Sequence, residues 1–142
     1  MTEEHAKLLL KDLSARLPYG VKLQVSSWDD EKMEYVDKAD TLYSISSDNH
    51  VRTSNEDQDF YIDEVKPYLF PISSMTEEQK NEYDYWQHHI LVSRYGWGDT
   101  LDDEEELWES PASFEYLIEN HFDDKGLIER GLAIDATGLG IY

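Results

Sequence analysis

The sequence predicts an α+β domain with an N-terminal helix, a small antiparallel sheet in the first half, and two helices in the second half. Three observations predict this class. Apolar residues recur at helical spacing near the start, short segments of alternating polarity follow, and two helix-start signatures occur after residue 75. Because 142 residues is the length of one domain, we assign residues 1–142 to a single compact unit.

The first helix is predicted by an apolar stripe that keeps to one face. The stripe consists of Ala6, Leu9, Leu10, Leu13 and Leu17. Thr2 precedes it as a candidate N-cap, and the acidic residues of the first turn suit the helix dipole. Pro18 and Gly20 then end the helix.

Short strands are predicted between this helix and about residue 70. Val21, Leu23 and Val25 alternate with polar residues and form the first strand. Residues 28–40 are interpreted as a charge-rich connection with a strand near Tyr35. The further segments are strands at 41–46 and 60–62, turns at 48–49 and 55–59, an extended segment at 68–70, and a last short strand at 132–134.

Two helices are predicted in the second half. Thr76 and Gln79 match a capping box, and the helix is expected to continue to about Tyr95. Its predicted buried face carries Tyr83, Trp86 and Ile90. Ser110 followed by Pro111 matches a cap with proline at the first helical position. The predicted core face of that second helix consists of Phe114, Leu117, Ile118 and Phe122.

The charge is strongly negative and unevenly distributed. The chain has 32 Asp and Glu against 12 Lys and Arg, a net charge of −20. Up to Arg52 there are 10 acids against 7 bases, whereas 22 acids against 5 bases follow from Thr53 onward. Leu, Ile, Val and Phe still make up 33 of 142 residues, about 23%, above the roughly 20% typical of disordered chains. We therefore expect a folded core under an acidic surface.

Composition also excludes several classes of function. An acidic surface repels nucleic acid and anionic membranes, so neither is an expected partner. The same surface attracts basic proteins, which are the expected partners. No cysteine is present, which excludes disulfides and thiolate metal sites. The acidic start does not match a signal peptide, and no apolar run approaches the roughly 20 residues of a membrane span. We expect a cytoplasmic protein without a cofactor.

Three blocks of residues form a specific pattern along the chain: residues 8–13 with 17–21, residues 62–68 with 73–78, and residues 121–123 with 125–128 and 131–133. Together they resemble a family of small uncharacterised proteins from gut bacteria and their phages. They occur in the family's order across nearly the whole chain, whereas residues 83–113 match nothing in its pattern. The resemblance implies one compact domain. It implies no activity and no catalytic residues.

Two places could form a small enzymatic or metal-dependent site. Asp84 and His88 lie one turn apart on a predicted helix, so both side chains could face one ion. His121 and Asp123 lie in the most specific block of the resemblance, although a histidine at a helix end is expected to cap the helix. Neither place matches a known catalytic or metal-binding motif.

The remaining hypothesis is a non-catalytic protein-interaction domain, and the sequence favours it. Aromatic residues alternate with acids in the second half, and exposed aromatics with a carboxylate rim would attract and anchor a basic partner. The predicted contact residues are Trp97, Asp102, Asp103, Glu104, Glu105, Glu106 and Trp108. One form of such binding is mimicry of DNA phosphates by spaced carboxylates. Both hypotheses remain open at this point.

Overall fold

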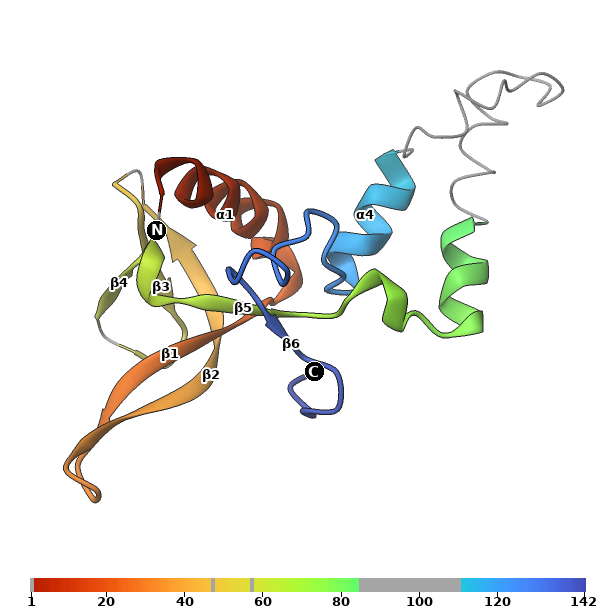
Figure 1. The fold of residues 1–142 in the computed structure, drawn as a ribbon. Helices are drawn as coiled ribbons and strands as arrows, with labels where there is room; N and C mark the ends of the chain where they lie inside the picture. The colour runs from red at the N-terminus through yellow and green to blue at the C-terminus, as the bar shows by residue number, and fades with distance from the viewer. Residues whose placement is uncertain (1, 47, 57, 85–110) are drawn as a thin grey trace, which may run out of the picture.

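The computed structural model describes residues 2–46, 48–56, 58–84 and 111–142 (Figure 1). Within them the α+β class is confirmed: an N-terminal helix packs on a mostly antiparallel sheet, and helices follow in the second half. Among these residues, the helices are all too short or too polar to cross a lipid bilayer.

Helix α1 spans Glu3–Arg16 and begins as predicted. The Thr2 side chain accepts a hydrogen bond from the backbone amide of His5 at 3.1 Å, which satisfies one of the free amides of the first turn. A short 3₁₀ helix, η1, continues over Leu17–Tyr19. Gly20 then takes a left-handed conformation with φ 70°, which an L side chain would resist, and turns the chain into the sheet.

The described residues form a six-stranded sheet with strand order β4-β3-β2-β1-β5-β6. The strands are β1 (Lys22–Asp29), β2 (Glu34–Ile45), β3 (His50–Thr53), β4 (Asp59–Tyr61), β5 (Lys66–Leu69) and β6 (Ile134–Asp135). Neighbouring strands are antiparallel except for β5 and β6. Short 3₁₀ helices, η2 (Ile62–Glu64) and η3 (Ile72–Ser74), flank β5.

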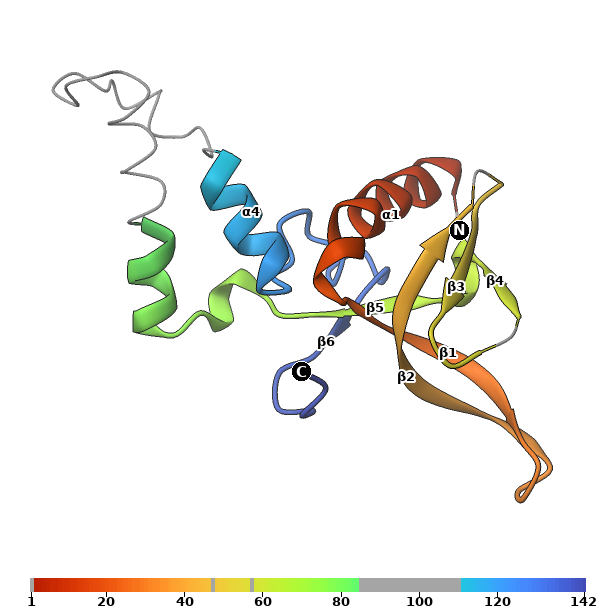
Figure 2. The ribbon, with the colours of Figure 1, turned by 180° about the vertical axis from the view of Figure 1, so that it is seen from behind.

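The main core lies between α1 and one face of the sheet. Leu9 and Leu13 of α1 are fully buried against Leu23 and Val25 of β1. Alternation along β1 places Leu23 and Val25 on the covered face, because successive strand residues point to opposite sides. Figures 1 and 2 show α1 lying along this face from opposite sides of the molecule.

A second apolar cluster supports the helices of the second half. Residues 77–84 form the first of these helices, and its capping box is confirmed by reciprocal hydrogen bonds between Thr76 and Gln79 at 2.9 and 3.1 Å. Helix α4 spans Pro111–Glu119. The buried members of this cluster are Met75, Tyr116, Leu117 and Phe122.

Two expectations about burial and strand extent were wrong. Phe114, predicted on the core face of α4, is 36% exposed, because the groove between α4 and α1 is not filled beside it. Residues 28–40 are not a connection: β1 continues to Asp29 and β2 begins at Glu34, so residues 30–33 alone form the turn. Trp86 and Ile90, predicted on the buried face of the first second-half helix, lie outside the described residues.

Candidate functional site

The predicted interaction residues fall outside the part of the chain that the structure describes. Trp97, Trp108 and the five acids Asp102, Asp103, Glu104, Glu105 and Glu106 all belong to residues 85–110. His88 belongs there too, so its pairing with Asp84 is not tested, although Asp84 itself is exposed on the described helix. The candidates that can be placed are His121, Asp123 and surfaces that the sequence did not single out.

His121 ends helix α4 through its backbone. The amide of Phe122 donates to the carbonyl of Leu117 at 2.8 Å, and the amide of His121 donates to that of Ile118 at 3.2 Å. This is the Schellman pattern, which needs a left-handed residue at the position of His121, and its φ is 65°. The predicted capping role is therefore filled by the main chain.

The His121 side chain is held in a neutral, partly buried setting. Its ring stacks on Tyr142 with centroids 3.8 Å apart and planes 10° from parallel. Burial, and secondarily the positive charge of Arg16, lowers the pKa of His121 to about 4. The imidazole is therefore neutral at pH 7, and its Nδ1 is buried without a hydrogen-bond partner in the described structure.

Asp123 is occupied by hydrogen bonds to the main chain. Its two carboxylate oxygens accept from the amides of Leu127 at 2.8 Å and Ile128 at 3.0 Å. The residue is 8% exposed, so this carboxylate orders the turn that follows α4. A side chain used in this way is poorly placed to act as a general base.

Beside them lies a buried ionic cluster that ties α1 to the segment after α4. The Arg16 guanidinium, which is 0% exposed, donates to Asp12 at 2.8 Å, to Asp124 at 3.1 Å and to the carbonyl of Phe122 at 2.6 Å. Lys125 pairs with both Asp12 and Asp124, at 3.2 and 3.1 Å. Two cations and two anions thus cancel each other's charge, which is the condition for burying them.

The described residues offer no metal site. Among residues 2–46, 48–56, 58–84 and 111–142, three or more His, Asp or Glu side chains nowhere come together in a way that could hold an ion. The carboxylates of Asp12 and Asp124 are near each other, but Arg16 and Lys125 occupy them.

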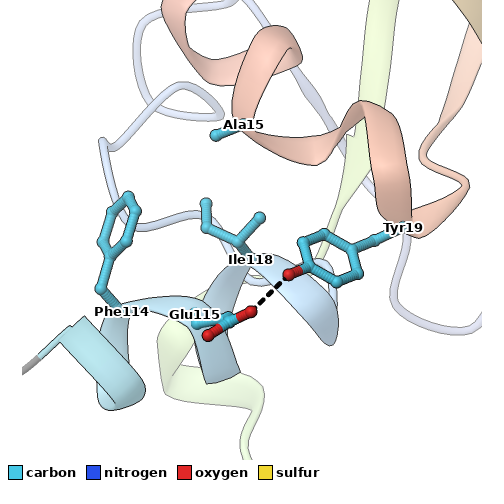
Figure 3. Close-up of a pocket in the computed structure, with 5 residues that line it drawn as sticks. All are labelled: Ala15, Tyr19, Phe114, Glu115 and Ile118. Carbon is cyan, nitrogen blue, oxygen red and sulfur yellow. Dashed lines mark hydrogen bonds between the residues drawn. The ribbon is translucent and has the colours of Figure 1, made fainter.

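A shallow apolar pocket separates α1 from α4 (Figure 3). Its volume is about 280 Å³, and Ala15, Tyr19, Phe114, Glu115 and Ile118 line it. The Tyr19 hydroxyl donates to Glu115 at 2.6 Å across its mouth. That hydrogen bond, with smaller contributions from burial and the nearby carboxylates, raises the pKa of Tyr19. The hydroxyl and the carboxylate that line this pocket are therefore bonded to each other.

The distal part of the β1–β2 hairpin, which we call the arm and define as residues 26–39, exposes aromatic side chains. In the described structure these residues pair only within the β1–β2 hairpin, since β5 reaches β1 at Leu23 and Gln24 and β3 reaches β2 from Leu42 onward. Figure 1 shows the arm extending away from α1 and the other strands. Figure 2 shows the same extension from behind.

The arm exposes large apolar side chains among acids. Trp28 is 48% exposed and Tyr35 is 67% exposed, and the two face each other across the strands with ring centroids 5.2 Å apart. Met33 at the tip is 70% exposed. Residues 28–38 carry five acids against two bases. The arm therefore combines an aromatic anchor with a local excess of negative charge.

The tip of the arm is ordered by its own hydrogen bonds. The Asp29 carboxylate accepts from the amides of Glu31 at 2.9 Å and Lys32 at 3.3 Å, which fixes the turn. Met33 takes a left-handed conformation with φ 54°, which is unfavourable for a residue with a side chain. Sequence reasoning missed the arm, although the pairing of Trp28 with an aromatic seven residues later could have indicated a hairpin.

Comparison with protein-family models, with curated protein sequences and with solved structures finds no match to this chain.

Proposed function

We propose that this chain is a non-catalytic protein-interaction domain that binds a basic partner, and that the arm is a contact surface for it. The observation that carries the proposal is the exposure of Trp28, Met33 and Tyr35 on a hairpin that projects from the fold. An isolated two-stranded hairpin gains little stability in water, so an arm of this kind is best explained by a role outside the monomer.

The charge of the arm supports a basic partner over other partners. Aromatic side chains with a rim of carboxylates resemble the anchor and rim of protein interfaces. The net charge of −20 would make two copies repel each other and would repel nucleic acid. The same charge would speed the encounter with a cationic surface.

The enzymatic alternative has less support from the described residues. His121 is neutral and stacked, Asp123 caps a turn, and the buried carboxylates are paired with cations. These arrangements stabilise the fold. They supply neither a free base nor a nucleophile in a cleft.

A random peptide library selected against the immobilised protein tests the proposal. We expect the enriched peptides to carry net positive charge and to be released as the salt concentration rises from about 0.05 to about 0.5 M, because screening shortens the range of charge attraction. Enrichment of neutral or acidic peptides, or of none, would contradict binding to a basic partner.

A matched pair of variants separates specific binding from adhesion to a highly charged protein. Trp28→Leu removes the anchor and Tyr43→Leu removes a similarly exposed aromatic of β2 outside the arm, and both leave the net charge at −20. The selected peptides should lose most of their binding to the first variant and keep it for the second. Equal binding to both variants would remove the arm from the proposal.

A further inference from the structure

A small open pocket, which we call the notch, lies beside Trp28 and Tyr35 of the arm. Its volume is about 340 Å³, and it is lined by Trp28, Tyr35, Asn55, Glu56 and Gln58. The volume is at the lower end of the range for small-ligand sites. Trp28 and Tyr35 of the arm form one wall of the notch, and the loop between β3 and β4 forms the other.

The aromatic wall suits a cation. The planes of Trp28 and Tyr35 meet at 75°, so the pair forms a corner in which the edge of one ring points at the other. A T-shaped pair leaves at least one ring face uncovered by its partner. Ring faces are negative in character and attract cations placed over them, tryptophan most strongly.

The loop wall is fixed to β2 before any ligand arrives. Asp40, which is 3% exposed, accepts hydrogen bonds from the main-chain amide of Asn55 at 3.0 Å and from its side-chain amide nitrogen at 2.8 Å. The amide of Ser54 also donates to the carbonyl of Thr41 at 3.0 Å. The Asn55 side-chain nitrogen points to Asp40, and its amide oxygen is left to accept a hydrogen bond.

The polar groups of the notch are acceptors of hydrogen bonds. Glu56 pairs with Lys38 through its carboxylate oxygen Oε1. Gln58 adds a second side-chain amide. Two ring walls, the Glu56 carboxylate and the amide oxygens of Asn55 and Gln58 define the ligand that this notch can take.

From this arrangement we infer that the notch binds an arginine side chain of the basic partner. A guanidinium group is flat, stacks on aromatic rings and carries five N–H donors for the carboxylate and amide oxygens. A methylated lysine would have fewer donors or none and would need a more complete aromatic enclosure. The inference rests on the proposed function, because it names the group of the partner that the arm recognises.

Nuclear magnetic resonance titration with capped tripeptides tests the inference. The probes are Gly-Arg-Gly, Gly-Lys-Gly and Gly-citrulline-Gly, where citrulline keeps the shape of arginine and lacks its charge. We expect the arginine probe to shift the Trp28 indole N–H signal, and the citrulline probe to bind at least about fivefold more weakly, since the cation–π and charge-assisted terms are lost. The lysine probe should bind more weakly than the arginine probe.

Variants localise the effect to the notch. Glu56→Gln and Tyr35→Leu should each weaken binding of the arginine probe several-fold, and Tyr43→Leu should leave it unchanged. Lys38→Met should strengthen binding, because it frees the carboxylate of Glu56, and this gain should exceed that of Lys11→Met, which makes the same charge change on α1. Glu56 is the least exposed of these side chains, at 16%, and the amide spectrum verifies the fold of each variant.

Equal binding of the arginine and citrulline probes, or equal gains from Lys38→Met and Lys11→Met, would overturn the inference. So would an absence of shifts at Trp28. If selected basic peptides still require Trp28 while Glu56→Gln has no effect on them, the notch fails and the proposed function stands. If no basic peptide is selected at all, the proposed function fails.

Discussion

Replacing Arg16 by methionine removes a cation that the fold surrounds with two carboxylates and a carbonyl. Methionine keeps much of the length and apolar stem of arginine, so the change mainly removes charge and hydrogen bonds. Asp12, which is 0% exposed, would then keep only its contact with Lys125 at 3.2 Å. The variant therefore leaves a buried carboxylate poorly compensated.

The expected loss follows from the burial of these partners. Removing one member of a buried ion pair typically costs about 3–5 kcal/mol, because the remaining charge stays buried. A total unfolding free energy of roughly 5–15 kcal/mol is usual for a domain, so Arg16→Met should remove a large part of it. With a urea m-value of about 2 kcal/mol/M, a loss of about 4 kcal/mol lowers the unfolding midpoint by about 2 M.

Urea denaturation followed by circular dichroism measures this loss, with two controls. Lys7→Met changes a cation of the same helix whose pair with Glu3 is highly exposed at 3.7 Å, and it should cost less than about 0.5 kcal/mol. The double variant Asp12→Leu/Arg16→Met removes both charges of the buried pair and leaves Asp124 paired with Lys125. It should therefore be more stable than Arg16→Met alone.

Two results would refute this reasoning. A loss below about 1 kcal/mol for Arg16→Met would mean that the cluster does not hold α1 to the segment after α4. A double variant less stable than Arg16→Met alone would mean that the remaining buried charge is not the source of the loss.

Two further predictions concern residues in left-handed conformations. The pKa of His121 is about 4 in the folded state against 6.5 for the free side chain, so the unfolded chain takes up the proton first as pH falls. Protonation of His121 therefore leaves the free energy of unfolding unchanged above about pH 6.5 and lowers it as the pH falls toward 4. The loss is about 1–3 kcal/mol after allowance for the partial exposure of the side chain. Urea midpoints from pH 7 to 4 should fall more steeply for the wild type than for His121→Asn, and equal slopes would contradict the assignment. At the arm tip, Met33→Gly should raise thermal stability slightly, by about 0.5 kcal/mol, because glycine relieves a left-handed strain of about 1–2 kcal/mol at some entropic cost. Met33→Ala keeps the strain and should show no gain; the opposite order would show that the tip is not strained.

The elements with a local physical signal were predicted well from the sequence. The stripe of α1, its Thr2 cap and its end at Gly20 all depend on neighbouring residues, as does the capping box at Thr76. Pro111 opens α4 as expected, since a proline at the first helical position loses no hydrogen bond. Local chemistry of this kind can be interpreted without knowing the rest of the fold.

Most of the arm was not predicted as strand, because burial does not shape its sequence. Strands are recognised by alternation of apolar and polar residues, which reflects one covered face. Beyond about Ser27 the arm packs against little, so both faces carry charged residues and the segment resembles a loop. The main-chain pairing of β1 with β2, from Lys22↔Thr41 to Asp29↔Glu34, is what keeps the arm extended.

The buried ionic cluster was missed for a different reason. Asp12 and Arg16 lie four residues apart beside the apolar stripe of α1, a spacing that sequence alone also gives to exposed pairs. Their burial depends on Asp124 and Lys125, which come from the other end of the chain. Contacts over such a separation leave no periodic pattern in the sequence.

The central claim is that the arm recognises a basic partner, and amide chemical-shift mapping with a selected basic peptide tests it most directly. We expect the largest changes at residues 26–39 and at the indole of Trp28. Changes confined to the acidic residues 102–106, with the arm signals unmoved, would contradict the claim and return the contact surface to the acidic run that the sequence first suggested.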